Sequence, residues 1–104
     1  MVIYEVNLAI DDEIYTKFRL WLKEHVTEML QFPGFMQASI FKPEIDDASV
    51  QKKLTIQYQL KNRDDLEKYF SEFAAKMRED GIKRFSDKFS ATRRVFAVEE
   101  IIMN

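Results

Sequence analysis

The sequence contains no cysteine, which excludes a disulfide, a thiol nucleophile and a thiolate metal site. Only two glycines and two prolines occur among the 104 residues, which excludes a collagen-like or low-complexity chain. No apolar run approaches the roughly 20 residues of a membrane-spanning helix. The alternating segment 1–10 also lacks the basic region and the cleavage site of a signal peptide. We therefore expect a cytoplasmic protein with no membrane partner.

The charge of the chain is nearly balanced. Lysine and arginine number 16, aspartate and glutamate number 18, and the net charge is −2 at pH 7. Because nucleic-acid binding draws on a strong basic surplus, we expect no nucleic-acid partner. Hydrophobic residues make up 46% of the chain, which is enough for a packed core. The length fits a single core, and we expect one domain over residues 1–104.

Hydrophobic periodicity predicts six elements in the order β-α-β-β-α-β. They are a strand over residues 2–10, a helix from Asp11 or Asp12 to about Gln31, strands over Phe35–Lys42 and Leu54–Leu60 with an exposed loop between them at Pro43–Gln51, a helix between Asn62 and Gly81, and a strand over Ser90–Ile102. Asn62 is the expected N-cap of the second helix, and Gly81 its C′ residue. Ile82, Phe85 and Phe89 suggest one or two further helical turns.

With right-handed crossovers, this order gives an α+β fold, a ferredoxin-like βαββαβ sandwich. It consists of a four-stranded antiparallel sheet with both helices on one face. The side under the helices is expected to carry Val6, Leu8, Met36, Ile40, Leu54, Ile56 and Tyr58. The other side is expected to carry Glu5, Asn7, Gln37, Ser39, Thr55, Gln57 and Gln59, with Ile3, Phe35 and Phe41 among them.

This second sheet face is too polar for a core, yet it is aromatic enough to be covered. A second copy of the chain would cover it and would close a barrel of two sheets. We therefore predict a homodimer that forms through the polar sheet face. The alternative is a monomer in which water covers this face.

Several segments resemble a known group of proteins. Trp21–His25 and Gln31–Phe35 are similar to segments of the dimeric α/β-barrel superfamily, which includes antibiotic-biosynthesis-type monooxygenases and muconolactone-isomerase-like proteins. Val2–Val6, Asn62–Phe70 and Lys83–Arg94 more closely resemble a bacterial domain-of-unknown-function family of about a hundred residues. The resemblance covers nearly the whole chain. It implies the ferredoxin-like fold and a dimer, but no particular activity.

In two respects the sequence departs from the pattern of the superfamily, and each departure argues against one of its known mechanisms. Haem-degrading members of the superfamily carry a proximal histidine on the second helix, and here that helix has none. Cofactor-free oxygenases often use a tryptophan with an asparagine. Asn7 and Trp21 match these residue types, but the alternation of the first strand places them on opposite sides of the sheet. We therefore do not transfer that mechanism.

His25 is the only histidine, and it is the candidate catalytic residue. At 100° per residue it falls in the middle of a helical stripe. That stripe consists of Ile14, Phe18, Trp21, Leu22 and Met29. A histidine titrates near neutral pH, so it could act as a general base or acid. Trp21 would form a wall of the pocket, and Tyr4 and Tyr58 would supply hydroxyl groups. The alternative is a histidine that only packs at the edge of the core.

A local basic cluster is the second candidate feature. It consists of Lys83, Arg84, Lys88, Arg93 and Arg94, opposed only by Asp87. Arg93 or Arg94 could bind a carboxylate or phosphate through two parallel hydrogen bonds. Alternatively, the cluster is a solvated face, or its members pair with Glu5, Glu99 or Glu100 on neighbouring strands.

The sequence predicts no metal and no cofactor. A single histidine is too few for a zinc site, which has three or four protein ligands. Glu44, Asp46 and Asp47 lack the spacing of an EF-hand. We expect them to lie in a solvated loop.

Two functional hypotheses follow. In the first, the protein binds a small organic molecule, possibly an anion, in a helix–sheet pocket around His25. As an enzyme it would be a cofactor-free isomerase or oxygenase in which His25 transfers a proton. In the second, the protein is a non-catalytic dimeric protein-interaction module, and an exposed apolar patch should lie outside its dimer interface. The residues do not decide whether the protein is an enzyme.

Overall fold

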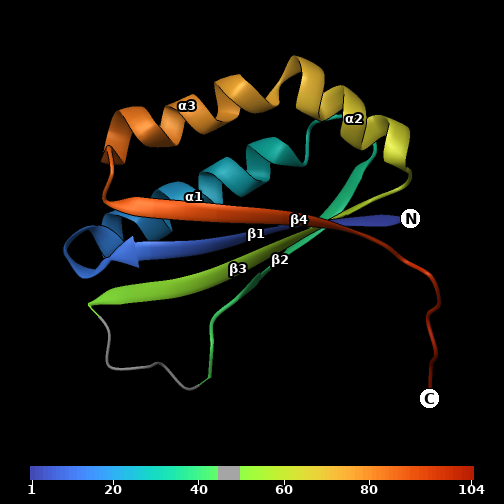
Figure 1. Cartoon of the computed structure of the whole chain (residues 1–104), viewed down its shortest axis with the longest axis horizontal. Coiled ribbons are helices and arrows are strands. Elements are labelled where there is room, and N and C mark those ends of the chain that lie inside the picture. Colours follow the sequence, from blue (N-terminus) through green and yellow to red (C-terminus); the bar gives the residue numbers. More distant parts are fainter. Residues whose placement is uncertain (45–49) are drawn as a thin grey trace.

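The computed structural model describes residues 1–44 and 50–104. In chain order the elements are β1 (Val2–Asp11), the 3-10 helix η1 (Asp12–Ile14), α1 (Tyr15–Met29), β2 (Phe35–Phe41), β3 (Gln51–Leu60), α2 (Arg63–Glu72), α3 (Ala74–Phe85) and β4 (Phe89–Ala97). The strands form one antiparallel sheet in the order β2-β3-β1-β4. Figure 1 shows α1, α2 and α3 on the same side of this sheet. The predicted ferredoxin-like sandwich is confirmed.

The core lies between the sheet and the helices. The central strand β1 contributes alternate side chains, including Tyr4, Leu8 and Ile10, and each of them is buried. Opposite them on α1, Phe18, Leu22 and Met29 of the predicted stripe are buried, together with Val26. Among the described residues, no helix has both the length and the apolar character to cross a membrane.

The first helix starts later than predicted. β1 continues to Asp11, because the Asp11 N–H donates a hydrogen bond to the Lys88 carbonyl at 2.9 Å. The Asp11 carboxylate does not cap a helix but accepts a hydrogen bond from Gln51 Nε2 at 3.0 Å. The 3-10 turn then leads into α1. The predicted N-cap of the second helix is confirmed, because Asn62 Oδ1 accepts from the Asp65 N–H at 2.9 Å.

The second helical segment bends at Phe73 and continues past Gly81. Phe73 has φ −128° and ψ −26°, and its ring stacks on Phe32 with centroids 4.5 Å apart. Helical hydrogen bonds still cross the bend, because the Met77 N–H donates to the Phe73 carbonyl. The prediction that Gly81 is the C′ residue was wrong, since α3 runs to Phe85. The predicted further helical turn is confirmed as far as Phe85, whereas Phe89 begins β4. The residue with positive φ at the end of α3 is Ser86, with φ 56°.

A β-bulge in β2 reverses two of the predicted orientations. Phe35 is paired with Leu60 and Gln37 with Gln59, so Met36 is the extra residue of the bulge. Phe35 is buried on the helix side, and Met36 is 53% exposed. The predictions that Phe35 lies on the polar face and Met36 under the helices were wrong, because one extra residue shifts the alternation.

Two strand boundaries also differ from the predictions. β4 ends at Ala97 rather than Ile102, because Ala97 pairs with Val2 at the start of β1 and no partner strand extends beyond it. β3 begins at Gln51 rather than Leu54. Residues 45–49, which include Asp46 and Asp47 of the predicted acidic loop, lie outside the described residues.

Gly34, in the turn before β2, is the position where a substitution should weaken the fold most clearly. Its φ is +83°, and an added Cβ would lie 2.2 Å from Asp65 Oδ2 and 2.5 Å from Asp65 Cβ. We expect Gly34→Ala to lower the free energy of unfolding by about 1–3 kcal/mol in urea titrations followed by circular dichroism. The control Gln31→Ala, at an exposed position of the same turn, should change it by less than about 0.5 kcal/mol. An unchanged urea midpoint for Gly34→Ala would contradict this account.

Candidate functional site

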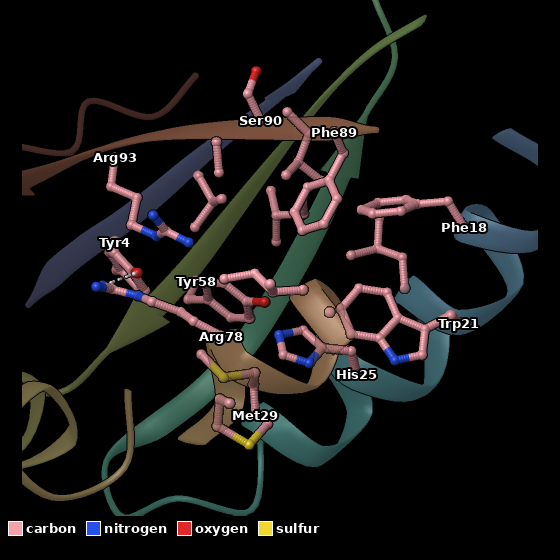
Figure 2. A pocket seen from close by; sticks show the side chains of 18 of the residues that line it. Tyr4, Phe18, Trp21, His25, Met29, Tyr58, Arg78, Phe89, Ser90 and Arg93 are labelled. Carbon is pink, nitrogen blue, oxygen red and sulfur yellow. Dashed lines mark hydrogen bonds between the residues drawn. The ribbon is translucent and has the colours of Figure 1, made fainter. Parts of the chain in front are cut away.

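A cavity of about 240 Å³ lies between the helices and the sheet (Figure 2). Its walls come from α1, α2, α3, β1, β3 and β4, and most of its lining side chains are apolar or aromatic. The lining side chains that can carry chemistry are Tyr4, Trp21, His25, Tyr58, Tyr69, Arg78, Ser86, Ser90 and Arg93. A dry cavity of about 150 Å³ is large enough to bind benzene. The space here is therefore sufficient for one ring with substituents or for two fused rings.

His25 lies on α1 and forms part of the cavity wall. Its imidazole is half-buried and stacks on the Trp21 indole, with ring centroids 4.6 Å apart and planes inclined by 26°. Burial lowers the pKa of His25 below its ordinary value. The charge of Arg93 adds to this lowering, and the carboxylate of Asp80 opposes it. The ring is therefore neutral near pH 7, the state in which a general base can accept a proton.

Trp21 connects α1 to α3. Its indole Nε1–H donates a hydrogen bond to Asp80 Oδ2 at 2.9 Å, and this bond lowers the pKa of Asp80. A Cβ placed on Gly81 would lie 3.0 Å from the edge of the Trp21 ring. The absent side chain of Gly81 therefore lets α3 approach the indole. Sequence reasoning missed Asp80 and misassigned Gly81, because both depend on contacts between helices distant in the sequence.

Tyr4 and Tyr58 contribute hydroxyl groups to the cavity, as predicted from their place on the helix-facing side of the sheet. Both side chains are 2% exposed, and their rings stack with centroids 5.7 Å apart. Burial raises the pKa of Tyr58 and of the adjacent Tyr69 above the ordinary tyrosine value. Their hydroxyl groups therefore stay protonated at neutral pH.

Of the two arginines predicted to bind a ligand, only Arg93 lies on the cavity side of the sheet. The register pairs Arg93 with Val6 and Arg94 with Glu5, so the two side chains lie on opposite faces of the sheet. Arg93 lines the cavity, and its guanidinium points toward the end occupied by Tyr4 (Figure 2). Arg94 does not reach the cavity. Its Nε–H donates to the Glu5 carboxylate, and its guanidinium lies over the Phe96 ring at 4.8 Å.

Arg78 is a cavity residue that sequence reasoning missed. It lies on α3, and its Nη2 donates to the Tyr4 hydroxyl at 3.3 Å. Its Nε is buried and has no hydrogen-bond partner among the described residues. Ala74, Arg78 and Gly81 are spaced by four and three residues, which places them on one face of α3. Because Ala74 is buried, this spacing could have indicated that Arg78 faces the interior. The bend at Phe73 hid this face, because it changes the phase of the helix.

The sheet face opposite the helices carries a closed polar network. Glu5 is 4% exposed and accepts hydrogen bonds from Asn7, Gln57 and Arg94. Thr55 in turn donates to Asn7 Oδ1 at 2.8 Å. The bonds from Gln57, Arg94 and Asn7 lower the pKa of Glu5 to about 2. Asn7 therefore lies on the face opposite Trp21, as the alternation predicted.

Metal ligands do not cluster in the described part of the chain. Across residues 1–44 and 50–104, no three His, Asp or Glu side chains lie close enough to hold a metal ion together. The chemistry of this cavity is thus that of an imidazole, tyrosine hydroxyls and arginines within an aromatic wall.

Comparison with known proteins identifies the family. Residues 1–99 match the domain of unknown function DUF4286, and the chain belongs to this family. No curated protein matches the sequence significantly.

Solved structures share the fold at low sequence identity. A proposed antibiotic biosynthesis monooxygenase from Deinococcus radiodurans is 15% identical, with a TM-score of 0.76 over 100% of this chain and 98% of that one. A mutant of SnoaB, a cofactor-independent oxygenase from Streptomyces nogalater, is 9% identical, with a TM-score of 0.74 over 99% and 98% of the two chains. A dimeric ferredoxin-like protein from an uncultured marine organism is 14% identical, with a TM-score of 0.71 over 100% of both chains. At these identities the likeness establishes the fold.

The lowered pKa of His25 has a measurable consequence for stability. An NMR titration of the imidazole should give a pKa below about 6.5, the ordinary value. The unfolded chain then binds a proton at a higher pH than the folded chain does. The free energy of unfolding should therefore fall as the pH drops from about 6.5 toward the folded-state pKa. The variant His25→Gln should lack this part of the pH dependence, and a titration midpoint at or above 6.5 would contradict the burial of the ring.

Proposed function

We propose that the protein binds a small organic molecule in the cavity around His25. The observation that carries this proposal is a largely apolar cavity of about 240 Å³ into which a few polar groups converge. Ligand sites in proteins typically combine an apolar wall with a small number of placed polar groups. The polar groups of the lining include the His25 imidazole, three tyrosine hydroxyls, two serine hydroxyls and the guanidinium groups of Arg78 and Arg93.

As an enzyme, the protein would be a cofactor-free isomerase or oxygenase. The neutral His25 imidazole would remove a proton from a carbon atom of the ligand. An isomerase would return this proton to a different atom of the same molecule. In an oxygenase, the carbanion would add to dioxygen, the second substrate and the oxidant, and the resulting peroxide anion would take the proton back from His25. The likeness to a cofactor-independent oxygenase supports this reading at the level of the fold.

We further propose that the protein acts as a homodimer through the sheet face that carries Glu5. No helix or strand of the described residues covers this face (Figure 1). It combines the Glu5 network with the exposed aromatic rings of Phe41 and Phe96. A mixed surface of this kind is typical of an interface between copies. The dimeric ferredoxin-like neighbour supports the proposal.

The proposed binding site can be tested by a ligand screen that compares the wild type with a variant at His25. We expect members of a panel of small organic acids to quench the fluorescence of Trp21, the only tryptophan. His25→Ala should weaken binding or abolish turnover while the far-ultraviolet circular dichroism stays unchanged. Glu24→Ala, at an exposed neighbouring position of α1, should behave like the wild type. Equal ligand binding by His25→Ala would remove His25 from the site and favour the alternative of a non-catalytic interaction module.

The dimer has its own test in size-exclusion chromatography with light scattering. At micromolar concentration the wild type should have about twice the chain mass of 12.4 kDa. Phe41→Asp places a charge on the proposed interface and should shift the mass toward the monomer. Leu20→Asp is the matched control, because Leu20 is 69% exposed on α1, away from that face. A monomeric wild type, or a Phe41→Asp variant that stays dimeric, would contradict the proposed interface.

A further inference from the structure

The cavity has two chemically different ends. At one end the guanidinium groups of Arg78 and Arg93 and the hydroxyl of Tyr4 lie together (Figure 2). At the other end, the rings of Trp21 and His25 stack on each other. Phe18 and Phe89, with centroids 5.0 Å apart, belong to this second end and complete its aromatic wall (Figure 2). A ligand that fits both ends has one polar head and one apolar body.

The described residues that line the cavity do not balance the charges at its polar end. No aspartate or glutamate is among the described residues that line the cavity. Other basic residues of the same elements do have acidic partners. On α3, Lys83 and Arg84 pair with the acids four residues before them, at 3.1 and 3.4 Å. The residue four before Arg78 is an alanine.

On β4, too, one arginine has an acidic partner and its neighbour in the sequence faces an uncharged residue. Arg94 pairs with Glu5, whereas Arg93 lies across from Val6 on the cavity side. The Nε–H of Arg78 is a buried donor without an acceptor among the described residues. Leaving a buried donor of a charged group unpaired is costly, so the guanidinium of Arg78, a residue that lines the cavity, has hydrogen-bonding capacity that the described chain does not use.

The form of the acceptor follows from guanidinium geometry. A guanidinium presents parallel N–H donors that match the two oxygens of a carboxylate. Both arginines line the cavity, but Arg78 is half-buried and Arg93 is exposed, so an anion between them keeps one side toward water. The remaining space is lined by rings and methionine side chains and suits a compact ring system.

We infer that the cavity selects a small ring-bearing carboxylic acid, whose carboxylate is bound by Arg78 and Arg93 and whose ring lies against Trp21 and His25. This inference rests on the proposed ligand-binding function and specifies its ligand class. It also fixes the orientation of the bound ligand. The carboxylate lies at the arginine end of the cavity, and the ring lies at the other end, where His25 could remove a proton. Binding through the carboxylate leaves the ring carbons free to react.

The experiment compares three probes that differ only in the head group: 1-naphthoate, 1-naphthamide and 1-naphthyl phosphate. Binding is followed by the NMR signals of the His25 imidazole, which are unambiguous because the chain has one histidine. We expect saturable shifts with 1-naphthoate and at least tenfold weaker binding of the uncharged amide. Arg78→Met should weaken 1-naphthoate binding at least tenfold and leave the binding of the amide unchanged. Lys76→Met, at an exposed position of the same helix, is the matched control and should bind like the wild type.

Arg93→Met provides a second variant that does not depend on the folding of an Arg78 variant, because Arg93 is exposed. It should also weaken 1-naphthoate binding at least tenfold. Equal affinity for acid and amide, or full affinity in both arginine variants, would overturn the inference and leave the proposed binding site intact. Tenfold preference for the phosphate over the carboxylate would also overturn it. If none of the probes shifts the imidazole signals at millimolar concentration, both the inference and the proposed function fail.

Discussion

The position of the Trp21 indole determines the shape of the helical layer. The ring is hydrogen-bonded to Asp80, stacked on His25 and in contact with the rings of Phe18 and Phe85. The indole therefore acts as a spacer between α1 and α3, and the missing side chain of Gly81 lets α3 pack directly against it. A helix interior normally disfavours glycine by about 1 kcal/mol relative to alanine. Its presence here is explained by this contact, and the cavity lies beside the same contact.

The charged side chains on the two sides of the sheet differ in whether they have partners within the chain. On the open face, the Glu5 carboxylate is nearly inaccessible to water. It accepts hydrogen bonds from three side chains of the same chain, so its charge is paired. On the helix face, Arg78 has a buried Nε–H without an acceptor among the described residues, and Arg93 lies across from a valine. Burying a charged group is tolerated when it is paired, as at Glu5. The two arginines of the cavity therefore differ from Glu5, because Arg78 keeps an unpaired buried donor and Arg93 lies across from an uncharged residue.

The fold and half of the site could be predicted because they follow from local patterns. Alternation placed Tyr4 and Tyr58 under the helices, and helical spacing placed His25 and Trp21 on the stripe of α1. The errors came from features with no local signal. An extra residue in β2 reversed Phe35 and Met36, and the bend at Phe73 moved Arg78 onto the cavity side. Both depend on how a segment meets a neighbour that is distant in the sequence.

The proposed interface and the proposed ligand site share their strands. Tyr4 and Glu5 are consecutive on β1, and Arg93 and Arg94 are consecutive on β4, so each pair has one member on each face. Because β1 pairs with β4 throughout its length, a constraint on one face of these strands also acts on the other. A partner that packs against Glu5 and Arg94 would hold the backbone that positions Tyr4 and Arg93. Dimer formation and the geometry of the cationic end of the cavity are therefore expected to be coupled, because they depend on the same backbone hydrogen bonds.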